Sequence, residues 1–144
     1  MVGLISVPAQ YAVRTLVSLA GRPAAEISRV RDIAEAEGIP YPFLAKIVGL
    51  MVQEGLLDSF KGPSGGVRLA QPPHKITLAQ VCGCIDGEEP LGDCILGLHD
   101  CSEAAPCALH EQWRDIRERL AGRLFGTTIA ELAAGRNLDG VGIK

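Results

Sequence analysis

The sequence predicts a mainly α-helical chain that carries one small β-hairpin. Three observations point to this fold class. Apolar residues recur at helical spacing in several segments, a glycine-rich turn separates two short strand-like segments, and a narrow apolar seam follows a long helical segment near the end. The chain has 144 residues, of which 47% are hydrophobic and 22% charged, so it can bury a core without disulfide bonds.

The first half of the chain begins with a predicted helix over residues 9–20, where apolar side chains form one stripe. A second, short helix is predicted over residues 29–37, with Ser28 as its N-cap. Gly38 is expected to end it, because glycine readily adopts the left-handed conformation found after helices. A third helix is predicted over residues 41–54. Two helices joined by such a short turn indicate a helix-turn-helix motif.

The third helix is predicted to bury one face and to expose the other. The predicted buried face comprises Phe43, Leu44, Ile47, Leu50 and Met51. The predicted outer face comprises Tyr41, Pro42, Ala45, Lys46 and Gly49. Small residues and one lysine suit close approach to a nucleic-acid groove, although an ordinary helical hairpin would show the same pattern.

A β-hairpin is predicted directly after these helices. Residues 57–60 and 67–70 can form its strands, and the turn over residues 61–66 contains three glycines and a proline. The turn has no bulky side chains and is flanked by Lys61 and Arg68, so cations and backbone amides can approach phosphates or enter a minor groove. A hairpin after a helix-turn-helix is the layout of a winged helix.

The second half of the chain contains three further predicted helices. Thr77 is expected to cap a short helix over residues 78–85, and a loop without periodicity follows over residues 86–106. The longest helix is predicted over residues 108–125, and Thr128 opens a capping box for the last one.

These segments divide the chain into three predicted units. They are a winged helix-turn-helix domain for DNA binding (1–75), a short helix with a cysteine-bearing loop (76–107), and a dimerisation helix with a C-terminal helix (108–144).

Charge and composition restrict the classes of function. The net charge is −3, but residues 1–75 carry a net +2, which places a nucleic-acid contact in the first half. Aromatic residues make up 4%, which argues against a base-stacking sheet that binds single strands. No apolar stretch is long enough to span a membrane, and the N-terminus does not resemble a secretion signal, so we expect a cytoplasmic protein.

The five cysteines, Cys82, Cys84, Cys94, Cys101 and Cys107, are an odd number in a chain with no sign of export, which disfavours a disulfide framework. Six residues separate Cys94 from Cys101, five separate Cys101 from Cys107, and two separate Cys107 from His110. Three thiols and an imidazole suffice for one metal centre. Because Cys107 and His110 are three residues apart, a shared helical face could direct both at one site.

The donor set alone leaves several readings open. Structural zinc uses the same ligands, but zinc sites usually contain close cysteine pairs, and the wide spacing favours a cluster held by a loop. Unpaired cytosolic thiols are a third possibility. Cys82 and Cys84 are interpreted as small, partly buried side chains of the short helix, without a role in the centre.

The chain resembles the IscR-like transcription regulators, bacterial winged-helix proteins that sense iron–sulfur status, nitric oxide or sulfur metabolites. The resemblance extends from about residue 10 to residue 132. It rests on the wing sequence of residues 61–66, the three spaced cysteines and the Trp-Arg-Asp sequence that follows His110 at residues 113–115. Shorter matches lie at residues 11–13, 32–34, 38–39, 43–44, 46–47 and 55–56.

The resemblance implies a DNA-binding regulator that senses iron–sulfur or redox status, with no enzymatic activity and no small-molecule substrate. It implies a [2Fe–2S] cluster on Cys94, Cys101, Cys107 and His110. It implies a homodimer through a helix whose seam comprises Leu109, Trp113, Ile116, Leu120 and Leu124. It further implies a double-stranded operator contacted by Tyr41, Pro42, Lys46, Lys61, Ser64, Gly65, Gly66 and Arg68.

Two alternatives stay within regulation and one lies outside it. A nitric-oxide-sensing repressor with a [4Fe–4S] cluster would take its fourth ligand near the N-terminus of the partner subunit, where this chain has Gln10, a poor ligand. A cluster-free or zinc-bound regulator would instead respond to oxidation of its thiols. A small redox or metal-carrier enzyme is disfavoured, because no catalytic constellation or cofactor fingerprint is recognisable.

Overall fold

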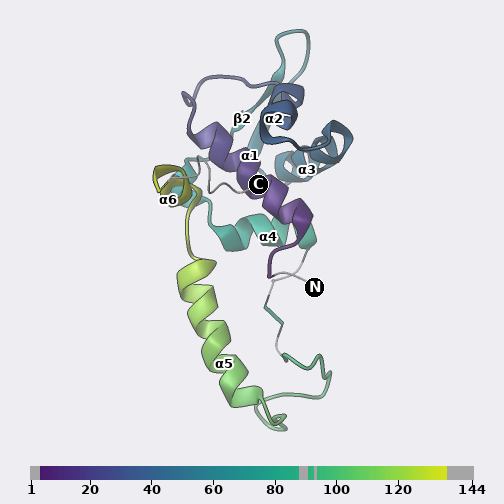
Figure 1. Cartoon of the computed structure of the whole chain (residues 1–144), viewed down its shortest axis with the longest axis vertical. Coiled ribbons are helices and arrows are strands. Elements are labelled where there is room, and N and C mark those ends of the chain that lie inside the picture. The colour runs from purple at the N-terminus through teal and green to yellow at the C-terminus, as the bar shows by residue number, and fades with distance from the viewer. Residues whose placement is uncertain (1–3, 88–90, 93, 136–144) are drawn as a thin grey trace.

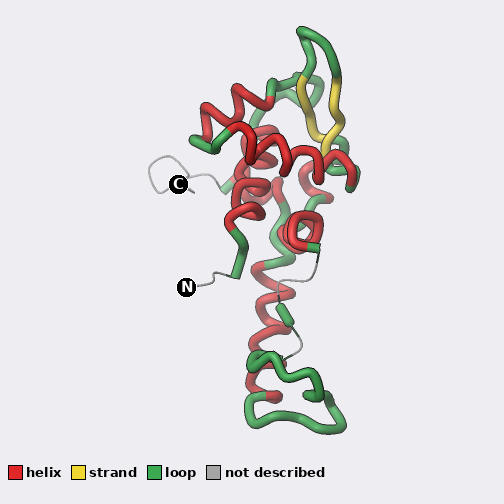
Figure 2. The backbone as a smooth tube through the Cα atoms, turned by 90° about the vertical axis from the view of Figure 1, so that its right-hand side faces the viewer, coloured by secondary structure: helices red, strands yellow, loops and turns green. Residues whose placement is uncertain are grey.

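Helix α1, Val7–Ala20, lies at the centre of the fold, and helices from both halves of the chain surround it (Figure 1). The computed structural model describes residues 4–87, 91–92 and 94–135. Two regions are distinguished below. The head comprises residues 4–87 and 125–135, and the arm comprises residues 91–92 and 94–124, which project from the head with the cysteine loop at the far end (Figures 1 and 2).

The core of the head forms where α1 meets helices from both halves of the chain. Ala12 and Leu16 of α1 are fully buried, and α1 packs against α2, α3, α4 and α6. The side chain of Ser6 caps α1 by accepting a hydrogen bond from the Ala9 amide at 3.2 Å. The Ser6 hydroxyl also donates to the Asp86 carboxylate at 2.8 Å, which ties the start of α1 to the end of α4.

The predicted helix-turn-helix is present as α2, Val30–Glu37, and α3, Tyr41–Gln53. Gly38 ends α2 in the left-handed conformation, with φ of 66°, as predicted. The prediction that Ser28 caps α2 is wrong, because the cap position is Arg29. Ser28 is buried, and its hydroxyl accepts a hydrogen bond from Arg22 at 2.8 Å.

The predicted buried face of α3 is only partly correct. Phe43 and Leu50 are 49% and 39% exposed, because they lie at the edges of the stripe that faces the core. Phe43 instead makes an edge-to-face contact with the ring of Tyr11, with 6.0 Å between the centroids. The side chains of α3 that the core does bury are Leu44, Ile47, Val48 and Met51.

The hairpin consists of β1, Leu57–Phe60, and β2, Gly66–Leu69, which pair antiparallel with Leu57 opposite Leu69. The backbone at Ser28 pairs with the other edge of β2, since Ser28 and Val67 exchange amide–carbonyl bonds of 2.9 and 2.8 Å. A Cβ atom at Gly66 would lie 2.2 Å from the Ser28 carbonyl oxygen, so only glycine fits at this crossing.

The segment after the hairpin returns the chain to the head. A short 3-10 helix, η1 (Pro73–Lys75), precedes α4, Leu78–Asp86, which Thr77 caps as predicted. Gln80 completes a capping box with Thr77, which was not predicted. The last helix, α6 (Ile129–Ala134), begins with the predicted capping box at Thr128. It packs on α1 and η1, and the Ile129 amide donates to the Ile76 carbonyl at 2.8 Å.

The long helix differs from the prediction at both ends. Helix α5, His110–Arg119, starts later than residue 108, because the His110 amide closes a tight turn onto the Cys107 carbonyl at 3.1 Å. After Arg119 the helix widens into a π-helical segment, η2 (Leu120–Leu124). The predicted frayed end at residues 137–144 lies outside the described residues.

Candidate metal centre and nucleic-acid interface

Three of the five cysteines meet at the end of the arm. The Sγ atoms of Cys94, Cys101 and Cys107 all lie within 4.8 Å of one another, and those of Cys94 and Cys107 are 3.8 Å apart. All three side chains are half-buried. The loop therefore brings together thiols that are up to 13 residues apart in sequence.

Local hydrogen bonds of the loop explain this convergence. The Gly97 amide donates to the Cys94 carbonyl at 3.1 Å, and Gly97 adopts the left-handed conformation with φ of 71°. The Cys101 amide donates to the Leu98 carbonyl at 3.3 Å. The Cys107 amide then donates to the Cys101 sulfur at 3.4 Å, which holds residue 107 beside residue 101.

His110 touches this group through one ring nitrogen. Its side chain is 9% exposed, and its Nδ1 atom lies 3.4 Å from the Cys101 sulfur. The prediction that Cys107 and His110 share a helical face is wrong, because α5 begins at His110 and Cys107 precedes it. The two residues approach the same place because the turn before α5 folds back.

Electrostatics within the group favour a bound cation. A hydrogen bond from the Leu98 amide lowers the pKa of the Cys94 thiol, with smaller support from Leu96 and the other two thiols. The pKa of Cys101 is raised: the Cys107 amide lowers it, but loss of solvation and the thiols of Cys107 and Cys94 outweigh this effect. Neighbouring thiolates repel one another, so a cationic centre would stabilise all three ionised sulfurs.

Three thiolates and one imidazole suit an iron–sulfur cluster or zinc. The centre is also accessible to solvent. Cys101 and Cys107 lie at an open cavity of about 480 Å³, which His99 and Asp100 help to line. Ile95 and Leu98 of the same loop are more than half exposed, so the arm presents an apolar surface beside the thiols.

The remaining two cysteines are packing residues, as predicted. Cys82 is fully buried under α1, and burial, followed by the charge of Asp86, raises its pKa to about 11. Burial also raises the pKa of Cys84, whose sulfur donates to the Leu50 carbonyl at 3.5 Å. Both therefore remain thiols near neutral pH and lie outside the three-sulfur group.

The outer face of α3 holds the residues that the sequence predicts to contact nucleic acid. Tyr41, Pro42 and Lys46 are exposed, and Tyr41 stands at the first position of α3. The Arg31 guanidinium lies 4.1 Å from the centroid of the Tyr41 ring, so a cation stacks on this side chain. Sequence reasoning missed Arg31. It is the second residue of α2, and its contact with Tyr41 has no signal in the sequence.

The wing presents Lys61 and Ser64 to solvent, whereas Gly65 and Gly66 are half-buried. The expectation of free wing amides is wrong for Gly65, because its amide donates to the Gly62 carbonyl at 2.9 Å within the turn. Sequence reasoning also missed Arg29, whose guanidinium donates to the Pro63 carbonyl at 2.7 Å and so connects α2 to the tip of the wing.

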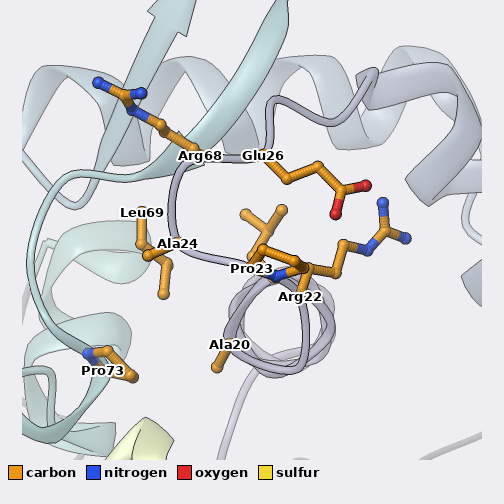
Figure 3. Close-up of a pocket in the computed structure, with 9 residues that line it drawn as sticks. Ala20, Arg22, Pro23, Ala24, Glu26, Arg68, Leu69 and Pro73 are labelled. Carbon is orange, nitrogen blue, oxygen red and sulfur yellow. The ribbon is translucent and has the colours of Figure 1, made fainter.

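Arg68 lies at the base of the wing, with its guanidinium 4.8 Å from the centroid of the Phe60 ring. A cavity of about 130 Å³ opens beside it, between the wing, the end of α1 and η1. Figure 3 shows Arg68 extending away from the other labelled side chains, whereas Arg22 and Glu26 extend toward the opposite side. Arg68 lines this cavity, and its guanidinium packs against the Phe60 ring of the neighbouring strand.

The predicted dimer seam is largely uncovered. Leu109, Ile116 and Leu124 are 40%, 49% and 41% exposed, while Trp113 and Leu120 are half-buried. The Trp113 indole donates to the Gly92 carbonyl at 2.8 Å, which holds the loop against α5. In the part of the chain that the structure describes, no helix has the length and apolar character needed to cross a bilayer.

Comparison with known proteins agrees with this architecture. The profile of the Rrf2 family, described as an iron-dependent transcriptional regulator, matches residues 5–135. An HTH-type transcriptional regulator of Mycobacterium tuberculosis is 38% identical over 133 residues, which cover 91% of this chain and 81% of the relative. The HTH-type transcriptional regulator IscR of Vibrio campbellii is 30% identical over 123 residues, which cover 85% of this chain and 73% of the relative.

A solved structure extends the agreement to the fold. CymR of B. subtilis, a global cysteine regulator, superposes with a TM-score of 0.79 at 24% identity, over 95% of this chain and 100% of that chain. The predicted fold class, mainly helical with a small hairpin wing, is confirmed, as is the resemblance to IscR-like regulators. The chain belongs to the Rrf2 family of transcriptional regulators.

Proposed function

We propose that this regulator is a homodimer that binds an operator in double-stranded DNA and that its DNA affinity depends on a [2Fe–2S] cluster. The ligands of the cluster are Cys94, Cys101, Cys107 and His110. The observation that carries the proposal is the mutual approach of the three sulfur atoms to within 4.8 Å, with the Nδ1 atom of His110 at 3.4 Å from one of them.

The donor set supports this choice of cofactor. Cysteine thiolates are the usual ligands of iron–sulfur clusters, and replacement of a thiolate by histidine raises the reduction potential of a [2Fe–2S] centre. Such a potential would suit a centre that responds to redox state. The half-buried sulfurs beside an open cavity would let iron and oxidants reach the site.

In the proposed complex, α3 enters the major groove and the wing contacts the flanking backbone. Tyr41, Pro42 and Lys46 approach base edges. Lys61, Ser64, Gly66 and Arg68 contact the phosphates, whereas Gly65, whose amide is bonded within the turn, shapes the tip of the wing. Arg29 and Arg31 join this surface between helix and wing. The two-fold symmetry of the dimer implies an operator with two similar half-sites about one helical turn apart.

The seam on the arm supports the dimer. A single α-helix of this length that projects into water is marginal without a packing partner. A second copy of the chain would cover Leu109, Trp113, Ile116, Leu120 and Leu124 in a self-complementary interface.

The path from cysteine loop to DNA-binding head runs through backbone contacts. Helix α5 continues through η2 to Phe125 and Thr127, whose carbonyls accept hydrogen bonds from the Ala79 and Leu78 amides at 2.9 and 2.8 Å. A cluster that joins the cysteine loop to His110, the first residue of α5, would therefore restrain the arm relative to the head. We expect a coupling of about 1–3 kcal/mol, which is roughly 5–150-fold in DNA affinity.

The decisive experiment is an anaerobic absorption spectrum of the full chain, with iron and acid-labile sulfide counted on the same sample. About two irons and two sulfides per chain, with visible charge-transfer bands, are expected. DNA binding is then measured with and without the cluster. A protein that stays colourless after anaerobic reconstitution would refute the cluster. DNA binding would then be tested separately, by measuring the affinity of the cluster-free protein for DNA.

A second candidate is a cluster-free regulator that responds to thiol oxidation. The 3.8 Å separation of the Cys94 and Cys107 sulfurs and the lowered pKa of Cys94 favour it. Colourless, iron-free protein whose DNA affinity falls on mild oxidation would support this candidate. A [4Fe–4S] centre would be recognised by about four irons per chain in the same assay. In all three cases we propose a cytoplasmic protein.

A further inference from the structure

Behind His110, on the side away from the sulfurs, lies a row of charged side chains. The Nε2 atom of His110 is 3.3 Å from the Oε1 atom of Glu103. The Arg114 guanidinium lies 3.3 and 3.4 Å from the two carboxylate oxygens of Glu103, and its other nitrogen donates to Glu111 at 2.7 Å. The row therefore runs from the imidazole along the first turn of α5.

The two ring nitrogens of His110 have different partners. Nδ1 faces the Cys101 sulfur at 3.4 Å, and Nε2 faces the Glu103 carboxylate. A neutral imidazole carries one proton, and an ionised carboxylate can only accept a hydrogen bond. The proton therefore belongs on Nε2, which leaves the lone pair of Nδ1 directed toward the sulfurs.

We infer that Glu103 is a positioning residue that fixes the tautomer and ring orientation of His110, so that Nδ1 serves as the ligand atom of the centre. The inference rests on the proposed ligand set. A carboxylate behind a ligating histidine holds the ring and raises its basicity, and its removal typically lowers metal affinity about 10–100-fold. Arg114 in turn holds Glu103.

The loop is built to keep Glu103 in this position. Glu103 lies in the turn between Cys101 and Cys107, where the Ala105 amide donates to the Ser102 carbonyl at 3.2 Å and to its hydroxyl at 3.1 Å. The Glu103 side chain is 73% exposed, so its ion pair with Arg114 alone adds little to stability. Its contribution is instead to orient the ring of His110, whose side chain is 9% exposed, through the hydrogen bond at Nε2.

The first test reads the tautomer directly in the metal-free full chain. Long-range proton–nitrogen correlation spectra at pH 8, on protein with labelled histidines, show which ring nitrogen carries the proton. Glu103→Ala should abolish the preference of His110 for Nε2–H, and Glu103→Gln should retain it because the amide oxygen still accepts. Glu118→Ala, an exposed acidic residue elsewhere on α5, serves as the matched control. His110→Ala assigns the signal.

A proton on Nδ1 in the wild-type chain, or an unchanged pattern in Glu103→Ala, would overturn the role of Glu103. This readout needs no bound cluster, so it stands whether or not the proposed function is correct. Circular dichroism checks that each variant keeps its helices.

The second test uses Co²⁺ alone as a probe of the centre, followed by its sulfur charge-transfer band. We expect Glu103→Ala to bind Co²⁺ about 10–100-fold more weakly than wild type, with Glu103→Gln in between and Glu118→Ala unchanged. Equal affinity of wild type and Glu103→Ala, beside a loss in His110→Ala, would refute the positioning role but keep the ligand set. Failure of the wild-type chain to bind would refute the ligand set itself.

Discussion

The head and the arm use the same residue types for different purposes. In the head, the core side chains of α1 and α3 are buried among helices from both ends of the sequence. On the arm, Ile95, Leu96, Leu98 and Ile116 are about half exposed. The head thus completes its apolar core within one chain, whereas the arm has an apolar surface that one chain does not cover.

The cysteines of the head and of the arm differ in burial and in thiol pKa. Cys82 is enclosed by apolar side chains, and its raised pKa keeps the sulfur protonated and unreactive. The sulfurs of the arm instead lie together at the surface, where amide hydrogen bonds lower the pKa of Cys94. A cysteine in the head contributes to packing, and a cysteine on the arm is available for chemistry.

The largest expected effect is the loss of iron on removal of an arm cysteine. Cys107→Ala removes one of three sulfurs that lie within 4.8 Å of one another, so the reconstituted chain should lose nearly all its iron while its helical content is unchanged. Cys84→Ser in the head is the matched control, because a hydroxyl can replace the sulfur as donor to Leu50. Iron bound equally well by both variants would contradict the proposed ligand set.

The next effect contrasts a core side chain with a seam side chain. Leu16 is fully buried in the head, so Leu16→Ala should lower the free energy of unfolding by about 2–5 kcal/mol, measured by urea denaturation. Ile116 is 49% exposed, so Ile116→Asp should leave the head folded and should instead weaken the association of two chains into a dimer.

Sedimentation velocity measures that association. Wild type and Glu118→Gln, which lies off the seam, should sediment as dimers, and Ile116→Asp should shift toward the monomer because a charge would be buried at the interface. A wild-type chain that sediments as a monomer, or an unaffected Ile116→Asp variant, would remove the seam from the proposal.

The head was predictable because its signals are local. The Gly38 turn, the caps at Thr77 and Thr128, and the glycine-rich wing each specify a boundary through short-range hydrogen bonds. The predictions were wrong where a residue bonds with a segment that is distant in the sequence. Ser28 pairs with Val67 of β2 and not with the start of α2, and periodicity alone could not reveal this contact.

The candidate site was predictable in composition but not in geometry. The spacing of the cysteines and His110 predicted which side chains would lie together, but their approach depends on turns at Gly97 and before α5 that have no periodic signature. Arg31 and Glu103 were missed for a related reason. Each contacts a residue of another element or turn, Tyr41 and His110 respectively, and such a contact becomes visible only in three dimensions.

A third, smaller effect concerns thiol reactivity in the reduced, metal-free chain. At pH 8 iodoacetamide should modify Cys94 well before Cys82, because the thiolate is the nucleophile and only Cys94 has a lowered pKa. Raising the pH toward 11 should narrow the difference, since Cys82 then begins to ionise, although its burial still slows its reaction. Peptide mass spectrometry measures both rates, and comparable rates at pH 8 in folded protein would contradict the distinction between head and arm cysteines.

The smallest effect separates contacts with phosphate from contacts with bases inside the head. Lys61→Ala should reduce the slope of log affinity against log salt concentration by about two units, because each protomer of the dimer loses one phosphate contact. Arg31→Ala should weaken binding and also change the preference among operator variants, because Arg31 stacks on Tyr41 at the start of α3. Lys75→Ala, in η1 outside the proposed contact, is the control. Equal salt slopes for Lys61→Ala and Lys75→Ala would show that the wing does not touch the DNA backbone, and α3 alone would then carry the contact.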